Sequence, residues 1–336
     1  MRPTGRIIAL TGLIVVLAAA AVAAMLTSGE ASARPTGGTV RLVAYSTPRE
    51  AYAKLIPAFQ DTSAGRGTSF EQSYGGSGEQ ARAVIAGLKA DVVAFSLEPD
   101  MTSLVKAGLV AKTWKENAFG GMVSRSVVVF ATRKGNPKNI RSWADLIKPG
   151  VDVVTPNVQT SGGAKWNVMA AYGAQRKIGL THARSVKYLE KLYDHVVSQD
   201  KSAREALQTF LAGRGDVLIA YENEATFAQK KNQPLDYVIP KATISIENPI
   251  AVTKKSGNRT TARAFVSYLR TKPAQVIFGE NGYRPVLQSA AKKFGFPVPK
   301  LQFSIRYLGG WAKVDKQFFD PRTGIVTKIQ KRKGGG

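Results

Sequence analysis

Residues 40–50, VRLVAYSTPRE, place a strand pattern directly before a helix start. The segment 40–45 is apolar and rich in β-branched residues, which is typical of a strand buried in a sheet. Thr47, Pro48 and Glu50 then occupy the N-cap, first and third positions of a predicted helix, where these residue types are favoured. A strand followed by a capped helix is the βα unit of an α/β fold.

The same alternation continues along the rest of the chain. Ser77 with Gln80 and Ser202 with Glu205 have the spacing of capping boxes, and Asp100 is expected to cap a further helix. Because helices alternate with strands, we expect an α/β fold whose sheet is mainly parallel. The other predicted strands are 68–74, 90–97, 125–135, 151–157, 215–221 and 243–255.

The first 33 residues have the pattern of an export signal. A basic start is followed by the apolar stretch 7–26 and the small-residue site Ala31-Ser32-Ala33, so we expect cleavage after Ala33. The apolar stretch is also long enough to cross a bilayer, and retention as a membrane anchor is the alternative. The chain has no cysteine, which excludes disulfides and a lipid-modified cysteine. We therefore expect an exported protein, periplasmic or otherwise extracytoplasmic, that is not a lipoprotein.

The chain is strongly basic, with 48 basic and 23 acidic residues and a formal net charge of +25. Such a charge favours anionic partners or serves solubility alone. The basic residues are scattered along the chain, and only KIQKRK at 328–333 is a run. This scatter and the export signal argue against nucleic acid as a partner. We expect this tail to be a solvated end or a contact with anionic cell wall or lipid.

Glycine and serine gather where two predicted strands give way to helices, in GGSG at 75–78 and TSGG at 160–163. In α/β sheets, ligands bind at the carboxyl ends of strands. The first amides of a helix lack intrahelical acceptors, and with the helix dipole they form a site for an anion. Glycine permits close approach of an oxyanion and serine adds a hydroxyl donor, although capped helices are ordinary in α/β proteins. Two further helix starts, at 46–47 and at Ser202, have the same character.

Sequence features of an enzyme are weak. No Walker A motif and no H-E-x-x-H motif occurs, and two histidines are too few for a histidine-rich metal site. The segment 76–81 fits a loose dinucleotide fingerprint, but it follows the second predicted strand and not the first. Glu222 and Glu224 start a helix, where acids compensate the helix dipole. We therefore expect no enzymatic activity, no cofactor and no metal.

At these motifs the chain resembles the sulfate/thiosulfate-binding proteins of bacterial ABC importers. The resemblance runs from about residue 40 to residue 318, and its most specific parts are SGGAKWN at 161–167 and GDVLIAYENEA at 215–225. It implies a two-lobed, type II periplasmic-binding-protein fold that closes on one tetrahedral dianion, sulfate or thiosulfate. It further implies a monomer that docks to an ABC permease.

The resemblance also implies how the chain is divided. The export pattern assigns residues 1–33 to a signal peptide or N-terminal anchor, and we expect 311–336 to form a C-terminal segment with the basic tail. Lobe I comprises 39–125 and 246–310, and lobe II comprises 126–245. The lobes are expected to close about crossing strands near 127–131 and 249–252.

Carried over position by position, the resemblance implies a ligand-binding set. Ser77, Gly162, Gly163 and Ala203 would donate backbone amides, and Ser161 would donate an amide or its hydroxyl. Arg204 would support the site from behind. Ser46 stands where an aspartate often contributes its amide, and Tyr221 stands where a tryptophan often donates its indole N–H, so the preference between sulfate and thiosulfate depends on these departures. The implied ligand-binding residues are Ser46, Ser77, Ser161, Gly162, Gly163, Ala203 and Tyr221.

The chemistry of the anion agrees with such a site. Sulfate at neutral pH only accepts hydrogen bonds, so amides and hydroxyls satisfy it and a carboxylate would repel it. Protonated phosphate would need an acceptor for its O–H. The alternatives are a binding protein for another oxyanion such as molybdate, tungstate or phosphate, an exported enzyme acting on a sulfated or phosphorylated substrate, and a wall-binding adhesive protein that uses the basic surface.

Overall fold

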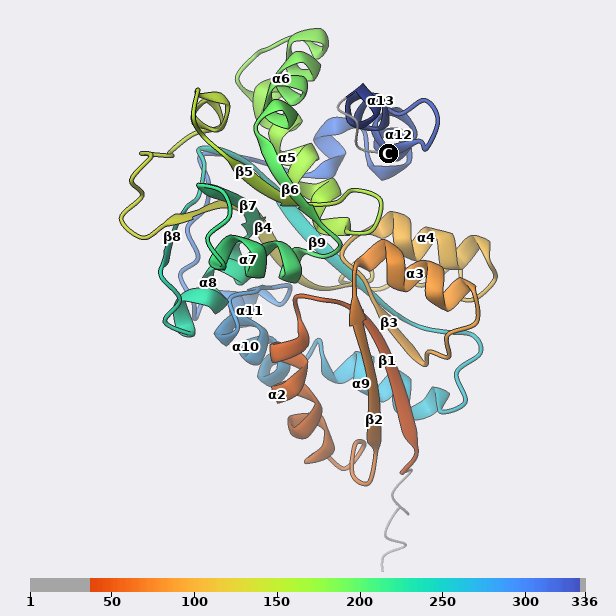
Figure 1. Cartoon of the computed structure of the whole chain (residues 1–336). Coiled ribbons are helices and arrows are strands. Elements are labelled where there is room, and N and C mark those ends of the chain that lie inside the picture. Colours follow the sequence, from red (N-terminus) through yellow and green to blue (C-terminus); the bar gives the residue numbers. More distant parts are fainter. Residues whose placement is uncertain (1–36, 333–336) are drawn as a thin grey trace, which may run out of the picture.

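The computed structural model describes residues 37–332, so the predicted signal and the last four residues of the tail lie outside the described residues. The described chain forms an eleven-stranded sheet with helices packed on its faces (Figure 1). The strands are β1 (Thr39–Tyr45), β2 (Ser69–Gly75), β3 (Val92–Ala94), β4 (Met122–Arg133), β5 (Val153–Pro156), β6 (Val196–Asp200), β7 (Val217–Tyr221), β8 (Leu235–Val238), β9 (Ala242–Val252), β10 (Arg284–Pro285) and β11 (Leu301–Phe303).

Most helices follow a strand directly, as the alternating pattern predicts, which confirms the α/β class. The α-helices are α2 (Arg49–Gln60), α3 (Ser77–Ile85), α4 (Glu98–Lys106), α5 (Gly162–Lys177), α6 (His182–Asp194), α7 (Ala203–Leu211), α8 (Glu222–Lys230), α9 (Arg259–Tyr268), α10 (Lys272–Glu280), α11 (Gln288–Ala291), α12 (Trp311–Val314) and α13 (Ile325–Arg332). Shorter helical turns cover Trp143–Ile147, Ile305–Leu308 and Asp315–Phe319. In the part of the chain that the structure describes, no helix has both the length and the apolar character needed to cross a membrane.

The sheet is mixed, with a parallel trio of strands in each half of the molecule. β1 runs parallel to β2 and β3 in the first half, and β5 runs parallel to β6 and β7 in the second half. β4 and β9 are antiparallel to each other, β9 is antiparallel to β3 and β4 is antiparallel to β7, so these two strands join the two trios. The expectation of a mainly parallel sheet therefore holds within each trio and not for the strands that connect them.

β4 and β9 run from one half into the other, side by side (Figure 1). β4 pairs with β9 over 122–127 and then with β7 from Val128 onward. β9 pairs with β4 over 245–249 and then with β3 from Ile250 onward. A closing motion about these two strands is thus compatible with the topology, and the hinge remains a prediction.

Several hydrophobic cores support the two halves, and the largest also includes residues of the first half. In the first half, α2, α9 and α10 cover one face of the sheet around Phe59 and Phe265, and α3 and α4 cover the other face around Phe95. In the second half, the largest core surrounds the fully buried Trp166. The rigid aromatic packing fixes the strand ends from which the site is built.

The C-terminal region packs on the second half of the molecule. Phe303 and Trp311 belong to the same core as Trp166, and β11 pairs with β9 at its second-half end. This packing favours assigning 301–310 to lobe II, although the lobe boundaries themselves stay a prediction. The basic run is helical up to residue 332 and is not a free end. It lies in α13, where Ile329 is buried and the lysines are exposed.

Candidate anion-binding site

The residues implied by the resemblance come together around one small cavity between the two halves. The cavity volume is about 10 Å³, so in this conformation it has room for a small molecule or ion and not for an organic ester. All of the implied ligand-binding residues line it. The complete lining is Tyr45, Ser46, Thr47, Gly76, Ser77, Ser96, Ser161, Gly162, Gly163, Ala203 and Tyr221.

Three helices begin at the cavity, and each brings backbone amides to it. α3 begins at Ser77, α5 at Gly162 and α7 at Ala203. The first amides of each helix have no acceptor within the helix, and the dipole adds partial positive charge there. The predicted convergence of helix starts is therefore confirmed as geometry, and its use in ligand binding remains a prediction.

Two glycines of the turns are required by the packing of the halves against each other. A Cβ at Gly162 would lie 2.0 Å from the Leu97 side chain, and a Cβ at Gly76 would lie 2.6 Å from the Thr160 carbonyl oxygen. The consecutive glycines, which sequence reasoning attributes to close approach of a ligand, also serve this close approach of protein to protein.

Ser77 uses its hydroxyl inside the protein. The hydroxyl donates to Asp100 Oδ2 at 2.5 Å and accepts the Ser96 amide at 2.9 Å. The predicted capping box of Ser77 with Gln80 is wrong, because Gly76 is the N-cap and the Gln80 side chain bonds to Ser73. Only the amide of Ser77 is left for a ligand, as the resemblance implies.

Ser161 has the opposite arrangement. Its amide donates to the Asn157 carbonyl at 2.9 Å, so an amide role toward a ligand is closed in this conformation. Ser161 is the N-cap residue of α5, and its hydroxyl makes no capping bond to that helix. The buried side chain thus keeps its hydroxyl available at the cavity.

Tyr221 ends β7 and brings its hydroxyl to the cavity from the second half. The residue is 1% exposed, and its hydroxyl shares a hydrogen bond of 2.5 Å with Ser96 Oγ. Burial raises the pKa of this tyrosine well above its ordinary value, with the Ser96 bond opposing the shift, so the hydroxyl stays protonated. A protonated hydroxyl can donate to an anion, in place of the indole N–H that the resemblance implies at this position.

Sequence reasoning missed Ser96, which lies two residues after the end of β3. The Ser96 carbonyl accepts from Trp166 Nε1 at 2.8 Å and from Asn248 Nδ2 at 3.1 Å, and these bonds fix the residue at the cavity. Its place at the carboxyl end of a predicted strand is the signal that could have identified it. The other lining residues that were not singled out as ligands are Tyr45, Thr47 and Gly76.

Arg204 lies beside Ala203 and joins the two halves by ion pairs. Its guanidinium contacts Glu50 of α2 at 2.6 Å and Glu224 of α8 at 2.9 Å, and it also donates to the Thr47 carbonyl at 3.3 Å. Burial alone would lower the pKa of Arg204, but the two carboxylates outweigh it and raise the pKa. Glu50 comes from the first half and Glu224 from the second, so the pair network holds the halves together.

A second set of contacts closes the halves at the start of α3. The Thr160 carbonyl accepts from the amides of Gly78 at 3.0 Å and Glu79 at 3.3 Å. Arg82 Nη1 donates to the Gln159 carbonyl at 3.0 Å. The described conformation is therefore closed around the cavity.

The cavity wall itself is uncharged. None of the described residues that line it is a carboxylate, a lysine or an arginine. One buried acid, Asp100, is one contact away through Ser77, and burial raises the pKa of its carboxyl against the opposing effect of Lys165. Within residues 37–332 no group of three or more His, Cys, Asp or Glu side chains is placed to hold a metal ion. The lining therefore offers a ligand neutral hydrogen-bond donors and no carboxylate.

Predicted local details differ in two further places. α2 has Pro48 as its N-cap, and the Thr47 hydroxyl bonds instead to the Tyr283 hydroxyl at 2.8 Å. Asp100 lies inside α4, whose N-cap is Leu97. By contrast, the Ser202 half of the predicted capping box is confirmed, because its hydroxyl accepts the Glu205 amide at 3.2 Å.

Comparison with known proteins gives a consistent family. The model of the bacterial extracellular solute-binding proteins matches residues 40–284. A sulfate-binding protein of Synechococcus elongatus is 41% identical, with 95% of each chain covered. A thiosulfate-binding protein of Pseudomonas aeruginosa is 35% identical over 82% of this chain and 88% of its own.

A solved structure extends the likeness to the fold. The sulfate-binding protein SubI from Mycobacterium tuberculosis is 44% identical, with a TM-score of 0.82, and the match covers 84% of this chain and 99% of that one. These relatives are binding proteins by name. The chain therefore belongs to the bacterial extracellular solute-binding proteins and, within them, to the family of the sulfate- and thiosulfate-binding proteins, with the α/β periplasmic-binding-protein fold.

Proposed function

We propose that this protein captures sulfate, or thiosulfate, outside the cytoplasmic membrane and delivers it to the permease of an ABC importer. The observation that carries the proposal is the enclosed cavity whose wall holds helix-start amides and hydroxyls and no charged side chain. A dianion that carries no proton needs donors only, and a buried acceptor facing it would be repelled or left unpaired.

The donors can be assigned by what each group does in the closed conformation. Ser77, Gly162, Gly163 and Ala203 provide amides at helix starts. Ser161 provides its hydroxyl, because its amide is already bonded to Asn157. Two further donors complete the set, the amide of Ser46 and the hydroxyl of Tyr221.

Charge in this proposal is held one layer behind the cavity. Arg204 is compensated by Glu50 and Glu224, so the site gains a rigid connection and no free cation. The dipoles of the helices, fixed before the ligand arrives, stabilise the dianion without long-range charge. Arg204 is thus a positioning residue that ties α7 to α2.

The rest of the proposal concerns the cycle of capture and release. The halves open about β4 and β9 near 127–131 and 249–252, take up the anion, and close through the contacts of Arg204 and Thr160. The closed monomer then docks to the transmembrane subunits. The ligand is not changed chemically, which agrees with the absence of a carboxylate or nucleophilic pair at the described cavity wall.

Calorimetric titration with four anions tests the proposal. The chain from Arg34 is titrated with sulfate, thiosulfate, molybdate and phosphate at neutral pH. One-to-one binding of sulfate or thiosulfate with phosphate silent is expected. Binding of molybdate or phosphate alone would keep the cavity and change the solute, and silence with all four anions would reject the anion site.

A further inference from the structure

Three loops meet at the end of the first half where β1 begins. The loop after α4 meets the loop after β9 through the bridge between Val110 and Thr253 and through the Lys254 amide, which donates to Leu109 at 2.7 Å. The Thr253 hydroxyl donates to the Ala90 carbonyl at 2.5 Å and connects the loop after α3. The exposed cations of these loops and of the helix ends beside them are named here the basic face: Lys89, Lys106, Lys112, Lys254, Lys255 and Arg259.

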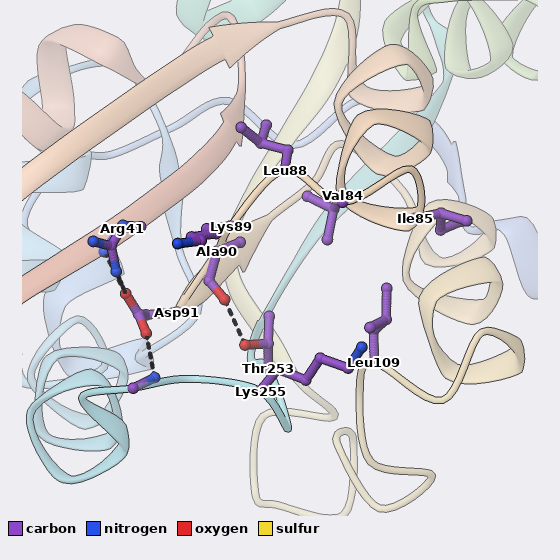
Figure 2. A pocket seen from close by; sticks show the side chains of 12 residues that line it. Arg41, Val84, Ile85, Leu88, Lys89, Ala90, Asp91, Leu109, Thr253 and Lys255 are labelled. Carbon is purple, nitrogen blue, oxygen red and sulfur yellow. Dashed lines mark hydrogen bonds and ion pairs between the residues drawn. The ribbon is translucent and has the colours of Figure 1, made fainter.

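The acids Asp91 and Glu71, which contact Arg41 of β1, are not paired with the basic face. Asp91 is buried and accepts from the Arg41 amide at 2.8 Å (Figure 2). It also accepts from the Ser256 hydroxyl at 2.7 Å and the Gly257 amide at 3.0 Å. The Arg41 side chain is itself paired with Glu71 at 3.0 Å. Within the described chain, no residue of the basic face forms an ion pair with a carboxylate. Its charges are therefore free to meet an external anion.

Apolar side chains lie among these cations. Ile85 is 44% exposed and Leu88 is 41% exposed. They border a pocket of about 440 Å³ whose rim also carries Lys89 and Lys255 (Figure 2). Single exposed apolar residues are ordinary on a protein surface. Together with unpaired lysines, however, they make the combination that favours the interface of an anionic bilayer, with alkyl groups at the acyl boundary and ammonium groups at the headgroups.

The described chain also begins at this end. Gly38 lies against the side chain of Asn258, since a Cβ at Gly38 would be 2.6 Å from Asn258 Nδ2, and Asn258 directly precedes Arg259 of the basic face. In the sequence, residues 27–36 connect this point to the apolar stretch 7–26. Ten residues span at most about 35 Å. In the alternative in which the apolar stretch is retained as an anchor, it would keep the start of the described chain within about 35 Å of the membrane surface.

We propose that the basic face is a docking surface for a lipid bilayer with anionic headgroups. β1 starts beside this face and ends at Tyr45 on the cavity wall, so the bilayer would contact the end of the lobe away from the anion cavity. Lipid contact then leaves the cavity accessible. The inference does not depend on the proposed anion and goes beyond capture of a solute.

Flotation with lipid vesicles tests the proposal. The chain from Arg34 is used, because the whole sheet and its cores lie in 37–332 and the solved relative matches 84% of the chain over 99% of its own length. Binding to vesicles of phosphatidylcholine and phosphatidylglycerol is expected, with little binding to phosphatidylcholine alone. A double substitution, Lys89→Glu with Lys255→Glu, should weaken binding to the anionic vesicles by about tenfold or more.

A matched control separates the basic face from net charge. Lys187 and Lys191 are exposed on α6 in the other half, and Lys187→Glu with Lys191→Glu makes the same change in net charge. This variant should bind the anionic vesicles within about twofold of the parent. Added salt screens the charges and leaves the apolar contact of Leu88. Leu88→Ser should therefore weaken vesicle binding of the parent protein most clearly in added salt.

Each other result contradicts the proposal. Equal loss in the α6 control would assign binding to the overall charge of the molecule. Equal binding to neutral and anionic vesicles, or no binding to either kind, would reject anionic lipid as the partner of the basic face. A third contradicting result concerns soluble DNA. If lipid binding is weak, DNA displaces the protein from the vesicles, and the Lys89/Lys255 variant binds DNA less tightly, the face would be assigned to a soluble polyanion. Circular dichroism and the urea unfolding midpoint of each variant check that the fold is intact.

Discussion

The anion cavity and the basic face are both suited to negative charge, and they differ in almost every physical respect. The cavity is enclosed, is lined by neutral donors and keeps Arg204 paired with Glu50 and Glu224 behind its wall. The basic face is exposed and carries cations without carboxylate partners in the described chain. Selectivity for one small anion comes from fixed dipoles in a dry site, whereas attraction to an extended anionic surface comes from free charge. A formal charge of +25 therefore does not locate the ligand.

The largest expected effect is on the cavity. Ser161→Glu places a carboxylate at an enclosed wall that otherwise holds only donors, and sulfate affinity should fall by about a thousandfold or more because two anions in low dielectric repel strongly. Isothermal calorimetry measures the loss. Ser161→Ala, which removes a single hydroxyl, should cost about tenfold or less. Sulfate affinity retained within tenfold in the glutamate variant would show that Ser161 does not face the anion.

The next effect tests the charge behind the wall. Arg204→Ala leaves the buried Glu224 without its cation, and the free energy of unfolding in urea should fall by about 3–5 kcal/mol. Arg204→Met combined with Glu224→Gln removes both partners and should recover most of that loss. A decrease below about 1 kcal/mol in Arg204→Ala would make the pair network irrelevant to stability.

A smaller effect is expected at Tyr221. Tyr221→Phe removes the hydroxyl that now bonds Ser96 and leaves the ring in place. Sulfate affinity should fall by about tenfold, the value of one hydrogen bond of roughly 1.4 kcal/mol. Ser96→Ala is the matched variant, because it keeps the tyrosine hydroxyl and removes its present partner. Unchanged affinity in Tyr221→Phe would place the hydroxyl outside the anion's first contacts.

A smaller effect is expected in the pH dependence of stability, through the ion pair of Glu50 with Arg204. Burial would raise the pKa of Glu50, but Arg204 outweighs it and lowers the pKa below its ordinary value of 4.5. A carboxyl with a lowered pKa in the folded state adds stability above its unfolded pKa, and that stability is lost as the pH falls through the folded pKa. The free energy of unfolding should therefore decline below about pH 4.5, and Glu50→Gln should flatten part of this decline. An identical acid profile in the two proteins would contradict the assignment.

The smallest effect separates the two regions directly. Lys89→Glu with Lys255→Glu should change sulfate affinity by less than about twofold, because exposed charges at this distance are screened by salt. Calorimetry at moderate ionic strength checks this. A tenfold loss would mean that the surface charge, and not the cavity, dominates anion binding.

The strand and helix pattern was predictable because its signals are local. VRLVAY at 40–45 reads as a strand from its own composition, and Ser202 caps α7 with a residue three positions away. The helix starts at Ser77 and Ser161 were identifiable from glycine and serine following strands. The lining of the cavity was thus largely accessible from short motifs and from the family resemblance.

The errors arise where the deciding partner is distant in the sequence. Ser77 does not cap α3 through its side chain because Asp100, 23 residues away, and the Ser96 amide take its hydroxyl. Thr47 is likewise diverted by Tyr283, 236 residues away. The antiparallel pairing of β4 with β9 joins segments more than a hundred residues apart, so no local period could show that the sheet is mixed.

The most direct test of the central claim is anomalous diffraction from crystals soaked with selenate, a tetrahedral dianion whose selenium can be located. The account predicts one strong peak in the cavity, within hydrogen-bonding distance of the Gly163 and Ala203 amides and the Ser161 hydroxyl, with no lysine or arginine in contact. Peaks confined to exposed lysines and arginines, with an empty cavity, would contradict it.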